Sequence, residues 1–305
     1  MHNSLVIRPD ILEAMIANRP IVALESTIIS HGMPYPENIT MAKKVEEIII
    51  KNGAVPATIA IMDGKIKIGL TDNELETLAK SKDVIKVSKR DFGYVLSQKK
   101  IGATTVSATM IACELAGISV FATGGIGGVH RGAQETFDIS RDLEELASTN
   151  VCVVCAGAKS ILDLSLTLEY LETKGVEVIG YKTKMLPAFY TNESQYQVDY
   201  QLDTPEDIAH LISSKWQLGI KGGILVANPI PDMYSMDAKT INQTIDEAIL
   251  KAQALNIKGK ETTPFLLKEI SQVTKGDSLA ANLELVYHNA DLASKIAVAY
   301  SEINR

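Results

Sequence analysis

The fold class is decided by the stretch Val151-Cys-Val-Val-Cys-Ala-Gly-Ala-Lys-Ser-Ile-Leu-Asp163. Residues 151–158 form an apolar, valine-rich run that is typical of a buried parallel strand. Residues 160–168 (Ser-Ile-Leu-Asp-Leu-Ser-Leu-Thr-Leu) predict a helix that follows this strand directly. Lys159 stands at the junction. The stretch therefore predicts one βα unit with a lysine between its strand and its helix.

The same alternation of strand and helix patterns continues along most of the chain. Helix starts are marked at Thr71-Asp-Asn-Glu74, which has capping-box spacing, and at Thr204-Pro-Glu-Asp207, where a cap residue, a proline and two acids follow in their favoured order. Repeated βα units predict a largely parallel sheet with helices on both faces. Five more segments have clear strand character: residues 21–25, 57–62, 119–123, 176–181 and 223–228.

From Asp237 onward the pattern becomes wholly helical. No linker rich in Gly, Ser or Pro and no internal repeat separates this part from the rest. We therefore predict a single domain over residues 1–305. Its expected fold class is α/β, as a three-layer α/β/α sandwich with a largely parallel central sheet and a helical C-terminal region.

Composition excludes several classes of function. The chain has 305 residues, 46% hydrophobic and 22% charged, and its net charge of −7 argues against DNA or RNA as a partner. No segment approaches the ~18 apolar residues of a membrane span, so no membrane partner is expected. The first residues lack a basic region followed by an apolar stretch. These features predict a cytoplasmic protein that acts on a small molecule.

The three cysteines are interpreted as small buried apolar residues. Cys152 and Cys155 have CxxC spacing, but both fall inside a predicted strand, where side chains three positions apart point to opposite faces. Cys113 lies in a helical pattern. An odd number of cysteines also gives no disulfide framework.

Lys159 is the first candidate for chemistry. Ligands of open α/β sheets bind beyond the carboxyl ends of the strands, where the next helix also presents its positive dipole end. Desolvation and this dipole both favour a neutral, nucleophilic amine over an ammonium ion. The alternative is a solvated lysine on the first turn of a helix. A lone lysine at this position in the sequence fits both interpretations.

Two small-residue segments follow each other between apolar elements. Gly102-Ala-Thr-Thr-Val-Ser-Ala-Thr-Met110 opens a helical pattern, and either phosphate binding at backbone N–H groups or ordinary N-capping explains it. Phe121-Ala-Thr-Gly-Gly-Ile-Gly-Gly-Val-His-Arg-Gly132 is a glycine-rich loop that delivers His130 and Arg131. It contains neither a dinucleotide fingerprint nor a nucleoside-triphosphate loop. Arg131 would suit a phosphate or carboxylate, although a solvated arginine looks the same.

The segment Phe137-Asp-Ile-Ser-Arg-Asp142 places two carboxylates around Ser140, which is the expected N-cap of the next helix. Asp138, outside that helix, is a candidate ligand for a hard cation through its carboxylate and waters. Asp142 either faces substrate or simply complements the helix dipole, and spacing alone favours the second interpretation.

Four further polar residues are candidates. Glu25 ends a predicted buried strand, so burial is expected to raise its pKa and to suit it to general acid catalysis. Lys86 belongs to a basic cluster that is either a solvated face or a phosphate contact. His31 and Asn282 are candidates for lining a pocket, but both also fit satisfied polar positions.

Taken together, six motifs closely resemble those of the pseudouridine-5'-phosphate glycosidase family, and the resemblance spans nearly the whole chain. The motifs are Val22-Ala-Leu-Glu-Ser-Thr-Ile-Ile-Ser-His-Gly-Met-Pro-Tyr-Pro36, Gly102-Ala-Thr-Thr-Val106, Phe121 to Gly132, Phe137-Asp-Ile-Ser140, Val154-Cys-Ala-Gly-Ala-Lys-Ser-Ile-Leu-Asp163 and Val226-Ala-Asn-Pro-Ile-Pro231.

The resemblance implies an enzyme that interconverts pseudouridine 5'-phosphate with ribose 5-phosphate and uracil. It also implies a divalent metal, usually Mn2+, and a homotrimer with the α/β/α fold. By position in the motifs, Lys159 would be the nucleophile, Glu25 the proton donor and Asp138 the residue that holds the metal through waters. The implied contacts to substrate are Lys86, Val106 and the turn of Ser140, Arg141 and Asp142, with Asn282 near the sugar phosphate; we add His130 from the glycine-rich loop.

The chemistry of a C-glycoside supports a lysine imine. Uracil leaves through carbon, so a pair of carboxylates and an oxocarbenium ion would face a poor leaving group. Two alternatives stay open from sequence, a Schiff-base aldolase acting on a sugar phosphate and a non-enzymatic sugar-phosphate sensor. The count of strands argues against the usual aldolase barrel. A small-molecule kinase is disfavoured because a triphosphate-binding loop is lacking.

Overall fold

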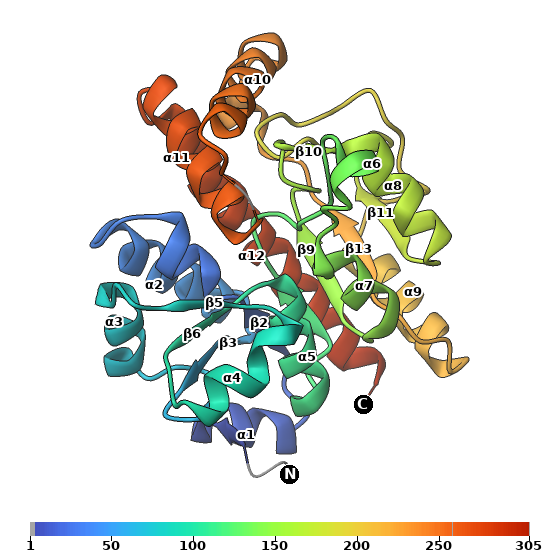
Figure 1. Ribbon diagram of the computed structural model, residues 1–305. Helices are drawn as coiled ribbons and strands as arrows, with labels where there is room; N and C mark the ends of the chain where they lie inside the picture. Colours follow the sequence, from blue (N-terminus) through green and yellow to red (C-terminus); the bar gives the residue numbers. More distant parts are fainter. Residues whose placement is uncertain (1–3, 258, 305) are drawn as a thin grey trace.

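The computed structural model describes residues 4–257 and 259–304 (Figure 1). Most of its strands form one mixed sheet in the order β1-β4-β3-β2-β7-β9-β13-β11-β12, with β6 paired to β3 and β5 paired to β6. The strands are β1 (Leu5–Ile7), β2 (Ile21–Leu24), β3 (Val55–Met62), β4 (Lys65–Ile68), β5 (Ile85–Val87), β6 (Gly102–Thr104), β7 (Val120–Ala122), β8 (Val129–His130), β9 (Cys152–Cys155), β10 (Leu162–Asp163), β11 (Glu177–Tyr181), β12 (Tyr200–Leu202) and β13 (Ile224–Ala227).

The six strands predicted from the sequence form the centre of this sheet. β3, β2, β7, β9, β13 and β11 are consecutive neighbours, and all their pairings are parallel. Antiparallel pairing is confined to one side, where β3 contacts β4 and β6. The predicted largely parallel sheet is therefore confirmed.

Helices cover both faces, as expected for three layers (Figure 1). α12 lies along one face with α2 and α9, and α5, α7 and α8 pack on the other. The helices are α1 (Pro9–Ile16), α2 (Glu37–Lys51), α3 (Asp72–Lys80), α4 (Phe92–Ser97), α5 (Val106–Ala116), α6 (Ala133–Thr136), α7 (Arg141–Ser148), α8 (Leu164–Thr173), α9 (Pro205–Gln217), α10 (Ala238–Ala254), α11 (Thr262–Val273) and α12 (Asp277–Ile303), with short helical turns η1 (Ile28–Gly32), η2 (Lys89–Asp91), η3 (Asp232–Tyr234) and η4 (Gly259–Glu261).

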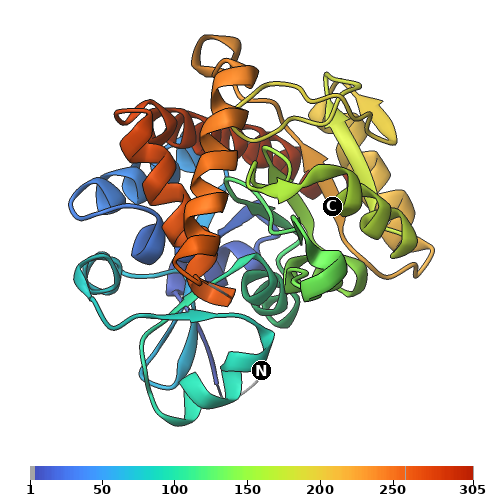
Figure 2. The same ribbon diagram turned by 45° about the horizontal axis from the view of Figure 1, so that its top comes forward.

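The C-terminal part is helical, as the sequence predicts. α10 and α11 pack against each other at the top of the view, and α12 runs behind the sheet along one of its faces (Figure 1). In the turned view, α10 crosses the front of the molecule between the N-terminal elements and the green segments that contain α7, and the chain then turns into α11 (Figure 2). The first turn of α11 thereby reaches the cavity described below.

Two predicted boundaries are wrong. Residues 160–168 do not begin a helix directly after Lys159, because Leu162 and Asp163 first pair with β8. α8 starts only at Leu164, where the Asp163 carboxylate accepts a hydrogen bond from the Leu166 N–H at 3.0 Å. Likewise, residues 102–104 form strand β6 before the Thr105 side chain caps α5.

The interpretation of the cysteines is confirmed. Cys113, Cys152 and Cys155 are free and completely buried. Burial raises the pKa of the Cys155 thiol to about 12, so it stays a neutral apolar group. Among the described residues, no helix is both long and apolar enough to cross a membrane.

Candidate active site

A cavity of about 560 Å³ brings together nine of the ten residues predicted for the site. These nine are Glu25, Lys86, Val106, His130, Asp138, Ser140, Arg141, Asp142 and Lys159. The tenth, Asn282, lines a smaller adjoining cavity of about 40 Å³ that shares Glu25, Lys86 and Lys159 with the first. The two cavities lie where β2 and β9 end, which is the expected place for a ligand in an open α/β sheet.

Lys159 lies on a short loop between β9 and β10, and its backbone is held on both sides. Its N–H donates to the Ile126 carbonyl at 3.1 Å, and its carbonyl accepts from the Leu162 N–H at 3.0 Å. The side chain is half-buried and lines both cavities. A fixed backbone restricts where the amine can lie, which suits a group that must meet one reacting atom.

Glu25 follows β2 and is only 8% exposed. Desolvation raises the pKa of its carboxyl above the usual range, and the positive charge of Lys159 and a hydrogen bond from Thr123 act in the opposite direction. The Thr123 hydroxyl, just beyond β7, donates to Oε1 of Glu25. This environment confirms the predicted raised pKa and gives a carboxyl suited to proton transfer.

Replacing Thr123 with valine should change the pH dependence of turnover. Valine keeps the shape of threonine but removes the hydroxyl donor, so the pKa of Glu25 should rise further. If Glu25 acts as an acid, the alkaline limb of the kcat profile then moves to higher pH. Rates measured over the accessible pH range check this; an unmoved limb in a correctly folded variant would contradict the role of Thr123.

Asp142 joins three segments and does more than cap its own helix. Its Oδ1 accepts from the Ser107 N–H at 2.9 Å, and its Oδ2 accepts from the Gly127 N–H at 2.8 Å. A Cβ at Gly127 would lie 2.2 Å from the Ser140 hydroxyl, so only glycine permits this approach. Asp142 therefore fixes the walls of the cavity, a role that neither sequence interpretation included.

Asp142→Asn should lower the free energy of unfolding by about 2 kcal/mol, because its amide NH2 would face one of the two backbone N–H groups. Asp163→Asn is the matched control, since asparagine caps a helix about as well as aspartate and α8 should lose little. Urea denaturation of both variants measures the difference. Equal, small losses would show that the two backbone contacts of Asp142 contribute little.

Four more predicted residues line the same cavity, from β5, α5 and the start of α7. Lys86 lies on β5, Val106 begins α5, and Ser140 caps α7 by accepting from the Asp142 N–H at 3.3 Å. Arg141 begins α7. Arg131, the other arginine considered from sequence, pairs with Asp246 and donates to the Ser160 carbonyl at 3.2 Å, and it lines a different cavity.

Asp138 and His130 face each other at the rim. His130 Nδ1 lies 3.9 Å from Asp138 Oδ2, and burial lowers the pKa of the imidazole. Within residues 4–257 and 259–304, no three His, Cys, Asp or Glu side chains gather closely enough to hold a metal ion. The carboxylate of Asp138 and a neutral imidazole are nevertheless donors that Mn2+ accepts, and hard cations often keep several waters.

Sequence reasoning missed other residues that line the cavity or support residues that line it. Lys89 and Arg90 lie in the basic cluster of residues 85–91, which was left open between a solvated face and a phosphate contact. Thr123 is the last residue of a predicted strand, and that position was its only signal. Glu145, described below, has no sequence signal that separates it from Glu144.

Comparison with known proteins now identifies the family. The family model described as indigoidine synthase A like protein matches residues 10–299. A pseudouridine-5'-phosphate glycosidase of Clostridium botulinum is 58% identical over 99% of this chain and 98% of its own, and one of Geobacillus kaustophilus is 59% identical over 97% and 99%. This chain belongs to the pseudouridine-5'-phosphate glycosidase family. The resemblance seen in the sequence is confirmed.

Two solved structures match this chain over its whole length. The prealnumycin C-glycosynthase in complex with ribulose 5-phosphate has a TM-score of 0.92 and 38% identity, covering 100% of this chain and 99% of that one. An indigoidine synthase A (IdgA)-like protein from Thermotoga maritima has a TM-score of 0.90 and 34% identity, covering 100% and 98%. The fold predicted for the family is thus the fold of this chain.

Proposed function

We propose that this enzyme reversibly cleaves the C-glycosidic bond of pseudouridine 5'-phosphate to give ribose 5-phosphate and uracil. The observation that carries the proposal is the placement of Lys159 and Glu25 in one cavity with cationic side chains farther along its wall. The names of the relatives support this substrate, and a related C-glycosynthase was solved with a pentulose phosphate.

The reaction divides into three steps. Opening of the ribose ring breaks the C1'–O4' bond, with Glu25 giving a proton to O4' while the amine of Lys159 adds to C1'. The nitrogen lone pair then forms a C1'=N imine as the electrons of the C1'–C5 bond pass to uracil, whose C5 takes up a proton. Water hydrolyses the imine, which frees ribose 5-phosphate and restores the lysine.

The smaller cavity is the proposed site of the uracil ring. Asn282 Oδ1 and His31 Nε2 are buried there without a hydrogen-bond partner, although such atoms are costly to leave unpaired. Burial lowers the pKa of His31, so its ring is neutral. Uracil offers both N–H donors and carbonyl acceptors to these atoms. These unpaired atoms support a contact of Asn282 with the base, whereas the resemblance implied a position near the sugar phosphate.

A divalent cation, Mn2+ by resemblance, fits the rim of the larger cavity. Asp138, with His130 beside it, would hold the ion through its carboxylate and waters. When bound, such an ion supplies positive charge that neutralises the phosphate and orients the sugar. The homotrimer and the cytoplasmic location stay predictions; light scattering of the purified chain tests the first.

One synthesis experiment tests the function. Purified protein, Mn2+, ribose 5-phosphate and uracil are mixed, and the products are separated by chromatography and weighed by mass spectrometry. We expect a phosphorylated nucleoside that resists acid hydrolysis, as a C-glycoside does. Absence of this product from folded, metal-loaded protein would favour an aldolase or a sugar-phosphate sensor instead. The open sheet already argues against the (β/α)8 barrel that is usual for such aldolases.

A further inference from the structure

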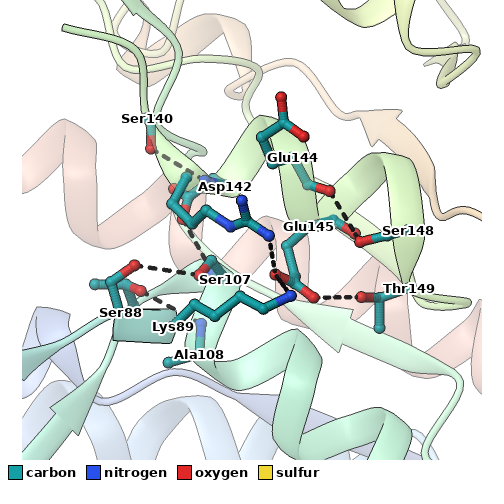
Figure 3. Close-up of polar contacts among 12 residues, drawn as sticks. Ser88, Lys89, Ser107, Ala108, Ser140, Asp142, Glu144, Glu145, Ser148 and Thr149 are labelled. Carbon is teal, nitrogen blue, oxygen red and sulfur yellow. Dashed lines mark hydrogen bonds and ion pairs between the residues drawn. The ribbon is translucent and has the colours of Figure 1, made fainter. Parts of the chain in front are cut away.

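A buried carboxylate beside the cavity has no part in the steps above. Glu145 lies on α7, and its side chain is only 4% exposed. Its Oε1 accepts from the Thr149 hydroxyl at 2.8 Å (Figure 3). Its Oε2 accepts no hydrogen bond. A buried carboxylate oxygen without a hydrogen bond is costly unless nearby positive charge compensates it.

Two cations supply that charge, and both line the cavity. Lys89 Nζ and Arg141 Nη2 each lie 3.5 Å from Glu145 Oε2. Lys89 comes from η2, after β5, whereas Arg141 begins α7, so Glu145 connects two walls of the cavity. Figure 3 shows Lys89 extending across toward Glu145. The cations stay about half exposed, at 51% and 41%, and remain accessible to a ligand.

The charge balance favours an anion at this wall. Two cations face one carboxylate, which leaves a net positive charge, and Lys86 and Arg90 line the same cavity. A mobile lysine or arginine side chain loses rotamer entropy when a ligand fixes it. A fixed carboxylate that holds both cations in advance reduces this loss.

We propose that Glu145 is a positioning residue that holds Lys89 and Arg141 ready for the phosphate of the substrate. This inference rests on the proposed function, because the phosphate is the anion that the cations meet. Glu145 itself does not reach the cavity and touches neither sugar nor base. Its effect should therefore be limited to the affinity for the phosphorylated substrate.

Glu145→Gln removes the charge and keeps an oxygen that accepts from Thr149. In the direction of synthesis, we expect KM for ribose 5-phosphate to rise about tenfold, which is about 1.4 kcal/mol. KM for uracil and kcat should stay within about twofold. Uracil is an internal control, because general damage to the fold would change both KM values.

Glu144→Gln is the matched control from the same helix. Glu144 pairs with Lys174 at 2.8 Å and with Tyr170, and it does not line the cavity. This variant should leave both KM values unchanged. As a direct readout, calorimetry with inorganic phosphate should show weaker binding to the Glu145→Gln variant than to wild type or the Glu144→Gln variant.

The outcomes separate this inference from the proposed function. If wild type makes no nucleoside, the proposed function fails, and the phosphate titration still tests Glu145. An active wild type with an unchanged or lower KM for ribose 5-phosphate in the Glu145→Gln variant would overturn the inference, as would equal rises in both KM values. If Glu145→Gln does not fold, the variant Lys89→Met replaces it as the test. Lys89→Met should raise KM for ribose 5-phosphate and leave KM for uracil unchanged, and any other result would overturn the inference.

Discussion

Replacing Lys159 with arginine should lower kcat by at least about 10³-fold while ribose 5-phosphate still binds. A guanidinium group cannot add to C1' and form an imine, so the proposed chemical step would lose its nucleophile. Arginine nevertheless keeps a positive charge beside Glu25, whose pKa that charge helps to lower. The variant therefore removes the amine without removing the electrostatic partner of Glu25. Steady-state rates and calorimetric titration with ribose 5-phosphate measure the two effects.

Borohydride trapping tests the same residue in the wild-type protein. Reduction in the presence of ribose 5-phosphate should leave a single covalent sugar-phosphate adduct on Lys159. Lys86 and Lys89 line the same cavity and act as internal controls, so peptide mapping must find them unmodified. An adduct on either of them, or a Lys159→Arg variant with near-normal turnover, would contradict the imine mechanism. Retained binding without turnover excludes a pure sensor role for this lysine.

The sequence predicts the centre of the fold because its signal there is local. The strands β3, β2, β7, β9, β13 and β11 are buried on both faces, so their apolar runs are nearly continuous. β5 was not recognised as a strand, because it is only three residues long and its pairing with β6 is non-local. β10 was also missed, because its two residues lie within a sequence pattern that is typical of a helix.

The sequence likewise predicts only part of the candidate site. Nine predicted residues lie in one cavity because they follow strands or begin helices at the same edge of the sheet. The residues that support them were not predicted. Glu144 and Glu145 are adjacent acids in one helix, and only the packing of α7 decides that Glu145 is buried and Glu144 is partly exposed. Tertiary contacts of this kind have no local signature in a sequence.

Glu25→Gln should lower kcat about 10² to 10³-fold, because glutamine cannot give a proton to O4' of the ribose. The shape of the side chain and its acceptor for the Thr123 hydroxyl are kept. In wild type, activity should fall as pH rises through the raised pKa of Glu25, since the protonated acid is then lost. The variant should lack this limb. Rates of wild type and variant between pH 5 and 9 show whether the limb belongs to Glu25.

The substitution Glu25→Gln, which lowers activity, should raise the free energy of unfolding relative to wild type as pH rises. The carboxyl of Glu25 has a higher pKa in the folded protein than its ordinary value of 4.5, so the folded state holds the proton more tightly. This contribution is fully present below the unfolded pKa and is lost as pH rises through the folded pKa. Glutamine has no such dependence. Relative to wild type, the variant should therefore become more stable at pH 8 than at pH 4.5.

Urea unfolding of both proteins at the two pH values measures this difference directly. If the variant is inactive but more stable than wild type at pH 8, the buried carboxyl of Glu25 is needed for catalysis although it lowers the stability of the fold. If the stability difference between the two proteins is the same at both pH values, the carboxyl of Glu25 is not desolvated enough to serve as the acid. Ring opening would then need another proton donor, even if Lys159 forms the imine.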